Sequence, residues 1–284
     1  MATILKGAPV VAAMNEANAA ICEQLKAQGI VPTLAVVRVG EREDDLSYER
    51  GVMTRCGKVG VAVKQYLLPA DAAQEDLLRV IAEINADDAI HGCLLFRPLP
   101  KQFDDRTVRA ALAPEKDIDG ITDGSLAGVF TNTDLGYAPC TAQACLEILK
   151  YYNIPLSGKR AVVVGRSLVV GKPAAMMLDR ENATVTLCNS RTQNLPTLCK
   201  EADVVVVAMG KLGAIGGGCL REGQVVVDVG IHVNEEGKLC GDVKFAEAEP
   251  VVDAITPVPG GVGTVTTSVL VGHVVAAAKK KAGL

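Results

Sequence analysis

The stretch VVVGRSLVVGKP, residues 162–173, decides the fold of the second half of the chain. Valines lead into Gly165, and Gly171 opens a segment with helical periodicity, so the stretch predicts a buried strand, a tight turn and a helix. The N–H groups left free at a helix start suit an anion. The spacing departs from G-x-G-x-x-G, because Ser167 takes the second glycine position and the last glycine comes one residue late. A modified dinucleotide-binding turn and an ordinary strand-to-helix turn both remain open.

Valine-rich runs surround this stretch. We predict strands at 33–40, 61–68, 90–96, 160–165, 183–188, 202–210 and 223–230, with helices between them. Near-continuous apolar runs are typical of parallel strands that are covered on both faces. A helix over 139–153 connects the two sets, and a last helix at 265–280 is expected to pack back on the first domain.

The sequence therefore predicts an α/β protein of two domains with a ligand cleft between them. Residues 1–138, completed by the helix 267–284, form an α/β substrate domain. Residues 139–266 form a Rossmann-like dinucleotide-binding domain.

Composition excludes several classes of function. The 284 residues carry a net charge of -4 with both signs scattered, so no basic stripe indicates a nucleic-acid partner. Polar residues interrupt the first apolar segment, which indicates neither a signal peptide nor a membrane span, and we expect a cytoplasmic protein. The nine cysteines form no C-x-x-C pair and the three histidines lie far apart, so no metal site is expected.

In the predicted dinucleotide-binding domain, the end of the second strand, 183–188, indicates which dinucleotide binds. An NAD site normally places a carboxylate there to hold the ribose hydroxyls, but the segment LCNSRT offers Ser190 and Arg191 instead. Arg166 adds a second guanidinium. Two arginines and a serine suit a 2′-phosphate, so NADP is favoured over NAD, the alternative being that both arginines are solvated surface charges.

Three further segments are candidates for binding. The segment DDLSYERGVMTRC, residues 44–56, predicts a helix capped by Asp44 or Asp45, with Tyr48, Val52 and Arg55 on one side. In PEKDIDGI, Asp117 and Asp119 stand beside Gly120, and composition alone favours a turn there over a ligand site. The loop TPVPGGVGTVTT, residues 256–267, lets backbone N–H groups approach a flat ligand, although a tight turn explains its glycines as well.

Seven segments in this order resemble the methylenetetrahydrofolate dehydrogenase/cyclohydrolase family over nearly the whole chain: Tyr48, RPLP (97–100), KDIDG (116–120), PCT (139–141), VVVGRSLVVGKP (162–173), VVVDVGI (225–231) and TPVPGGVG (256–263). The resemblance implies a tetrahydrofolate cleft, a nicotinamide cofactor on the second domain and a homodimer. It also implies that Asp119 bonds the pterin and that Tyr48 stacks on the folate ring.

The resemblance and the motifs together predict the site residues. Tyr48 and Asp119 are the predicted catalytic residues. The predicted substrate-binding residues are Tyr48, Val52, Phe96, Asp119, Pro259, Gly260 and Gly261. The predicted cofactor-binding residues are Gly165, Arg166, Ser167, Ser190, Arg191, Ile231 and Thr266.

Two departures from the family pattern carry a further hypothesis. The pattern has a Lys four residues after the Tyr and a Gln two residues before Pro-Leu-Pro, but here Val52 and Phe96 stand in those places. Hydride removal from the methylene carbon needs orientation and no protein base, whereas hydrolysis of the methenyl carbon needs proton transfer. We therefore expect a dehydrogenase without cyclohydrolase activity. The alternatives are a bifunctional enzyme with a substitute group such as Arg55 or Lys58, and a non-catalytic folate or nucleotide binder.

Overall fold

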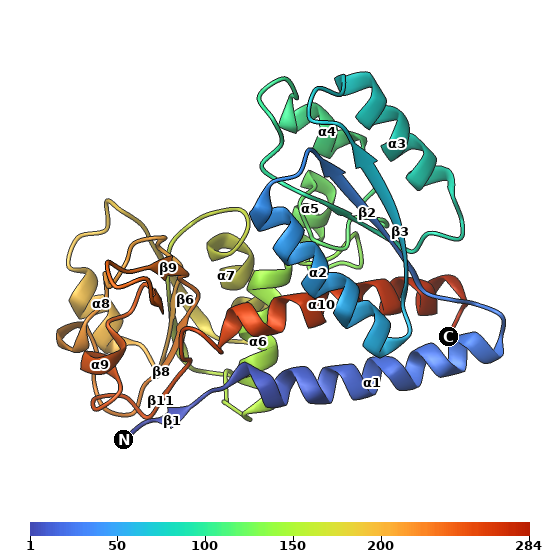
Figure 1. Cartoon of the computed structure of the whole chain (residues 1–284). Coiled ribbons are helices and arrows are strands. Elements are labelled where there is room, and N and C mark those ends of the chain that lie inside the picture. Colours follow the sequence, from blue (N-terminus) through green and yellow to red (C-terminus); the bar gives the residue numbers. More distant parts are fainter. The chain divides into compact units, whose positions relative to one another are not determined.

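Valine-rich strands of the second half build a six-stranded parallel sheet in the computed structural model, which describes all 284 residues (Figure 1). Its order is β1-β11-β8-β7-β5-β6, with β1 Thr3–Ile4, β11 Ala254–Ile255, β8 Val225–Asp228, β7 Val204–Val207, β5 Arg160–Val164 and β6 Thr184–Cys188. All four valines of β7 are buried, as expected for a central parallel strand.

Helices and one hairpin complete this part of the fold. They are α6 Cys140–Tyr151, α7 Gly171–Arg180, α8 Leu195–Glu201, the 3-10 turn η1 Gly217–Cys219, α9 Phe245–Ala248, and the antiparallel pair β9 His232–Val233 and β10 Leu239–Cys240. Alternate valines of the central strands pack with Ile215, Leu220 and Val252 in one hydrophobic core.

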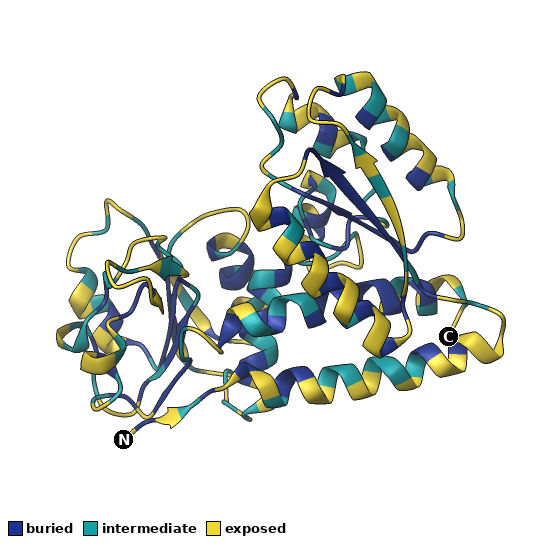
Figure 2. Ribbon diagram, viewed as in Figure 1, coloured by how far each residue is buried: buried dark blue, intermediate teal, exposed yellow.

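A second, three-stranded parallel sheet has the order β3-β2-β4, with β3 Ala62–Leu68, β2 Thr33–Val39 and β4 Gly92–Leu95. The helices of this part are α1 Gly7–Ala27, α2 Glu43–Val59, α3 Gln74–Ala86, α4 Asp105–Ala111, α5 Asp123–Thr131 and α10 Val262–Lys281. Strands β2 and β4 are buried, whereas the edge strand β3 exposes one face to solvent, where Lys64 and Tyr66 both contact Glu83 (Figure 2).

The chain divides into two compact units, each with its own sheet. The first unit comprises Met1–Ala12 and Thr141–Thr266, and the second unit comprises Ala13–Cys140 and Thr267–Leu284. The boundaries fall within α1, after the first residue of α6, and within α10. Two α/β domains with parallel sheets are therefore confirmed. The prediction placed the first twelve residues with the substrate domain, but they supply β1 to the six-stranded sheet.

The last helix packs back against the start of the second unit, as predicted. Ser268 of α10 donates a hydrogen bond to the side chain of Asn15 on α1, with 3.4 Å between the oxygens. By length and composition alone α10 could cross a membrane, but 56% of its most apolar window is buried within the protein. It is a core helix, which accounts for its apolar sequence.

Two local predictions differ from the structure. Helix α2 begins at Glu43 after Arg42, so Asp44 and Asp45 lie in its first turn and neither caps it. The two-residue strands β1 and β11 were not predicted, because two residues are too short to show a strand periodicity.

Candidate active site

A buried ion pair fixes the helix that carries Tyr48. Arg38 at the end of β2 donates from Nε to Glu49 Oε2 of α2 at 2.9 Å, and both side chains are almost fully buried. Gln65 of β3 donates a further hydrogen bond to Glu49. A buried ion pair is stable only when its geometry is good. Glu49, the residue next to Tyr48, is therefore fixed to both β2 and β3.

Apolar side chains surround the places that the family pattern gives to Lys and Gln. Val52 is completely buried, and Phe96, directly after β4, is 7% exposed. The ring of Tyr48 meets the ring of Phe96 edge to face, with centroids 5.9 Å apart and an interplanar angle of 73°. Neither Val52 nor Phe96 can donate, accept or transfer a proton.

The turn Asp117–Gly120 presents Asp119 from a rigid support. The fully buried Asp117 carboxylate accepts hydrogen bonds from the backbone N–H groups of Ile121 at 3.0 Å and Thr122 at 2.7 Å, and from the Ser125 hydroxyl at 2.6 Å. Gly120 has a φ of +68°, and a β-carbon there would lie 2.4 Å from the backbone nitrogen of Pro139. Only glycine fits this close approach. The two aspartates of the motif thus differ: Asp117 is held inside the turn, whereas Asp119 is half-buried and close to Tyr48.

Asp119 lies close to Tyr48 in the second unit. Burial, helped by the charge of Asp117, raises the pKa of Asp119 to about 6, against the lowering effects of the Cys140 side chain and the charge of Arg97. Burial of the Tyr48 hydroxyl raises its pKa above the usual range; Asp119 and Cys140 add to this, and a hydrogen bond with Thr267 of α10 opposes it. Tyr48 nevertheless keeps 38% of its surface exposed, so its ring remains available to a ligand.

The structure therefore brings together Tyr48, Phe96 and Asp119, and it adds Cys140 and Thr267, which the sequence did not predict as site residues. Cys140 stands in the quoted PCT segment and Thr267 ends the quoted segment TPVPGGVGTVTT, but the sequence singled out neither residue. Arg97 is held by Asp105 through two hydrogen bonds of 2.6 and 2.8 Å.

The turn after β5 has the geometry of a dinucleotide site. Gly165 has a φ of +126°, and a β-carbon there would lie 2.0 Å from the carbonyl oxygen of Ala208. A β-carbon on Gly171 would lie 2.0 Å from the carbonyl oxygen of Gly165. The Ser167 hydroxyl accepts a hydrogen bond from the N–H of Val170 at 3.1 Å. Close backbone packing of this kind brings the turn against the start of α7, where helix N–H groups suit an anion, so these residues fit a phosphate group.

The predicted 2′-phosphate residues are solvent-exposed. Arg166, Ser190 and Arg191 are all exposed, and neither arginine forms an ion pair. The backbone N–H of Arg191 donates to the side chain of Asn189 at 3.0 Å, which shapes the turn after β6. Two unpaired guanidinium groups on exposed loops are available to an anionic ligand.

The glycine loop between β11 and α10 belongs to the first unit, with Pro259, Gly260 and Gly261. The carbonyl oxygen of Gly260 accepts a hydrogen bond from the N–H of Gly7 at 2.8 Å. Ile231 is exposed and lies beside Gly263, where a β-carbon would meet its Cδ1 at 3.1 Å. The Thr266 hydroxyl donates to the carbonyl oxygen of Gly263 at 3.0 Å. The structure thus places Ile231 and Thr266 around one glycine.

Two buried aspartates that the sequence did not single out organise the ends of β7 and β8. Asp228 accepts hydrogen bonds from the N–H groups of Gly230, Asp242 and Val243 at 2.9 to 3.0 Å. Asp242 accepts from three consecutive N–H groups, those of residues 209–211, and from His232 Nε2 at 2.7 Å. Burial raises the pKa of Asp228 to about 6, although the three N–H donors lower it.

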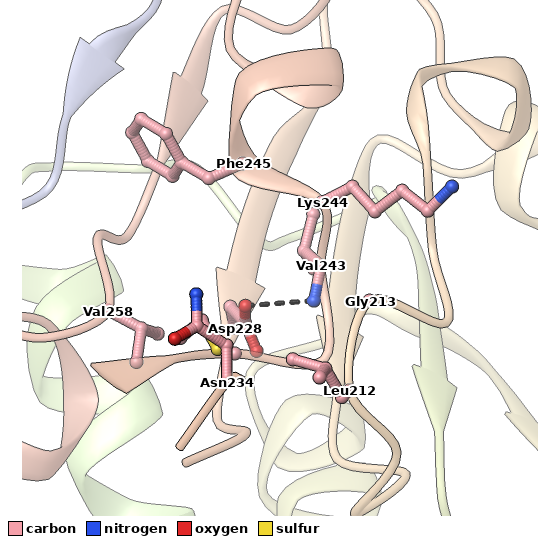
Figure 3. Close-up of a pocket in the computed structure, with 10 residues that line it drawn as sticks. Leu212, Gly213, Asp228, Asn234, Val243, Lys244, Phe245 and Val258 are labelled. Atoms are coloured by element: carbon pink, nitrogen blue, oxygen red, sulfur yellow. Dashed lines mark hydrogen bonds between the residues drawn. The ribbon is translucent and has the colours of Figure 1, made fainter. Parts of the chain in front are cut away.

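A cavity of about 390 Å³ lies beside this network (Figure 3). Its walls are mainly apolar, and none of the predicted site residues lines it. The residues that line the cavity are Leu212, Gly213, Asp228, Asn234, Cys240, Gly241, Val243, Lys244, Phe245 and Val258. Figure 3 shows the side chain of Lys244 directed away from the cavity, and its amine pairs with Glu247 at 3.2 Å. No cluster of His, Cys, Asp or Glu in the chain could hold a metal ion.

Comparisons with known proteins agree with this geometry. Residues 5–119 match the tetrahydrofolate dehydrogenase/cyclohydrolase catalytic domain, and residues 139–282 match the NAD(P)-binding domain of the same family. The chain is 52% identical to the bifunctional protein FolD of Carboxydothermus hydrogenoformans over the full length of both chains.

Solved structures support the same assignment. The bifunctional FolD of Campylobacter jejuni superimposes with a TM-score of 0.95 at 35% identity, over 99% of each chain. The Trypanosoma brucei FolD, solved with NADP and an inhibitor, gives a TM-score of 0.91 at 31% identity, over 100% of this chain and 99% of that one. The chain belongs to the tetrahydrofolate dehydrogenase/cyclohydrolase family and carries its NAD(P)-binding domain.

Proposed function

We propose that this chain catalyses NADP-dependent oxidation of 5,10-methylenetetrahydrofolate to 5,10-methenyltetrahydrofolate. The second unit would bind the folate, with α10 from residue 267 onward completing it, and the first unit would bind NADP. The nicotinamide of NADP would supply the hydride acceptor. The Tyr48 ring and the Asp119 carboxylate would orient the folate, which is the main requirement of this step because the two folate nitrogens stabilise the cationic product.

Residues of the first unit support NADP as the cofactor. Arg166 and Arg191 are exposed and unpaired, and no carboxylate follows β6 to hold ribose hydroxyls. The related enzyme of Trypanosoma brucei was solved with NADP. We propose the same preference here, together with a cytoplasmic homodimer; light scattering at micromolar concentrations tests the dimer.

The observations disagree on whether the chain also hydrolyses the methenyl product. Relatives up to 52% identical are named bifunctional, which favours an enzyme that retains cyclohydrolase activity over one that has lost it. Of the substitute groups named above, Lys58 is exposed and Arg55 is half-buried, and an arginine is a poor base. Asp119 is the better candidate, because a carboxylate with a pKa of about 6 can accept a proton at neutral pH.

Two residues of this chain argue against retained cyclohydrolase activity. The buried Val52 and Phe96 occupy the Lys and Gln positions and supply no proton-transfer group. We propose that hydrolysis is lost or strongly reduced, and this pair of side chains is the observation that carries the proposal.

One assay separates the candidates. Purified protein is mixed with 5,10-methylenetetrahydrofolate and NADP⁺, and the methenyl absorbance is followed as it forms and as it decays. Formation with decay at the spontaneous rate supports a dehydrogenase alone, and faster decay establishes the bifunctional alternative. Absence of formation leaves a non-catalytic binder. Repeating the assay with NAD⁺ tests the cofactor preference.

A further inference from the structure

The segment that follows β7 lies directly against the dinucleotide turn. A β-carbon on Gly165 would lie 2.0 Å from the carbonyl oxygen of Ala208, so the two backbones are in contact. The N–H of Ala208 in turn donates to the carbonyl oxygen of Val164 at 2.8 Å. The shape of the segment 208–211 therefore affects the edge of the dinucleotide turn.

Asp242 holds this segment by its backbone. Its Oδ2 accepts from the N–H groups of Met209 at 2.6 Å and Gly210 at 3.0 Å, and its Oδ1 accepts from the N–H of Lys211 at 2.8 Å. Three consecutive N–H groups converge on one anion when the backbone curves, and Gly210 permits the curve with a φ of +65°. Asp242 is completely buried, so this carboxylate sets the conformation of residues 209–211.

His232 fixes Ile231 to the same carboxylate. Its Nε2 lies 2.7 Å from Asp242 Oδ1, and a carboxylate oxygen only accepts, so Nε2 carries the proton and donates. On the other side of Ile231, the N–H of Gly230 donates to Asp228 at 2.9 Å, and a β-carbon on Gly230 would lie 2.3 Å from the backbone nitrogen of Asp242. Ile231 is 62% exposed, yet both of its neighbours are anchored.

The strand order assigns the two halves of the dinucleotide to different loops. Four strands of the sheet run in the order β8-β7-β5-β6, and a ligand of such a sheet lies across the carboxyl ends of its strands. The proposed 2′-phosphate residues Ser190 and Arg191 follow β6, and the proposed phosphate turn follows β5. The nicotinamide half is then left to the ends of β7 and β8, which are followed by the segment 209–211 and by Ile231.

We propose that Asp242 and His232 are positioning residues for the nicotinamide half of the cofactor: Asp242 shapes the segment 209–211, and His232 fixes Ile231 on the same support. This inference rests on the proposed function, which supplies the dinucleotide. Both side chains act through the backbone that they hold, and neither is a catalytic residue.

The proposal predicts that related ligands respond differently to one variant. His232→Leu removes the donor, so a fraction of the molecules no longer holds Ile231 in place. We expect the Kd for NADP⁺ to rise about tenfold, as for loss of one hydrogen bond to a charged acceptor. Adenosine 2′,5′-bisphosphate carries the 2′-phosphate and no nicotinamide, so its Kd should not change. The Kd for NAD⁺ should rise by the same factor as that for NADP⁺. Titration calorimetry measures all three.

Conservative variants and a control separate positioning from general packing. His232→Gln places an amide N–H₂ near the position of Nε2 and should restore the affinity for NADP⁺. His232→Ala removes the donor without adding bulk and should reproduce the effect of His232→Leu. Lys238→Leu is the matched control, because it also replaces a polar side chain of the hairpin by leucine, and the Lys238 amine pairs with the exposed Glu236 at 2.8 Å.

Failure of this inference and failure of the proposed function give different results. A protein that binds NADP⁺ but forms no methenyltetrahydrofolate refutes the function, and the comparison of the ligands then still decides the inference. An active protein in which His232→Leu changes the Kd for NADP⁺ no more than Lys238→Leu does would overturn the inference. Equal weakening of NADP⁺ and the bisphosphate would overturn it as well, because it would indicate a general loss of structure. Absence of NADP⁺ binding to the unmodified protein would overturn both.

Discussion

Under the proposed function, Val52 and Phe96 would limit the site to the first of the two reactions. We expect Val52→Lys or Phe96→Gln alone to restore little hydrolysis, because a lone Lys lacks a partner to orient it and a lone Gln has nothing to relay protons to. The double variant should accelerate methenyl decay measurably, since an acid–base group contributes on the order of a hundredfold or more.

The rate of decay of added methenyltetrahydrofolate measures this prediction without the first step. Dehydrogenase activity of the double variant serves as the control, because hydride transfer uses neither side chain. Fast hydrolysis by the unmodified protein would refute the interpretation of Val52 and Phe96 and direct attention to Asp119.

Arg166 and Arg191 are expected to bind the 2′-phosphate of NADP. Either Arg→Ala variant should weaken NADP binding by about 1–3 kcal/mol, the value of a charge-assisted hydrogen bond, and leave NAD binding nearly unchanged. Titration calorimetry with both cofactors measures the difference. The exposed Arg180 at the end of α7 offers a control variant. Equal losses for NADP and NAD would contradict the assignment.

The strand ends of the first unit depend on Asp228. Its two carboxylate oxygens accept three backbone N–H groups, so Asp228→Asn places an N–H₂ group against at least one donor. We expect the free energy of unfolding to fall by about 1–3 kcal/mol, the cost of a buried unsatisfied group. Urea unfolding measures it, and Glu235→Gln in the exposed hairpin loop is the control. An unchanged midpoint would mean that the amide is accommodated.

Strands and helices with a long apolar run could be predicted from the sequence. Elements that form only by pairing with residues far away in the sequence could not. Strands β5, β7 and β8 follow from their valines, and the turn after β5 from Gly165 and Gly171. The dinucleotide turn and the Tyr48 helix were recognisable because their signals are local.

Contacts around the turn that carries Asp119 show why the remaining features were missed. Cys140 and His273 are 133 residues apart and meet only in the folded chain. A buried cysteine and a lone histidine form no local sequence pattern. The two-residue strands β1 and β11 are strands only because they pair with each other in the folded chain.

The first residues of the whole chain are needed by the six-stranded sheet. The N–H groups of Thr3 and Leu5 donate to residues 253 and 255 at 2.7 and 2.9 Å, and Leu5 is completely buried. Deleting residues 1–6 should lower the free energy of unfolding by about 3–5 kcal/mol, through loss of a buried leucine and its strand. Urea unfolding tests this, with removal of the unburied residues 282–284 as the control. Equal stability of both truncations would show that β1 contributes nothing.

The pairing of Thr3 with Ala254 also fixes an order of events during synthesis. A ribosome releases β1 first and its neighbour β11 near the end, so the six-stranded sheet cannot be completed until almost the entire polypeptide has emerged. The three-stranded sheet lies wholly within residues 33–95 and can assemble while translation continues. During that interval α1 lacks its contact with α10, because the partner of Asn15, Ser268, is among the last residues to be made.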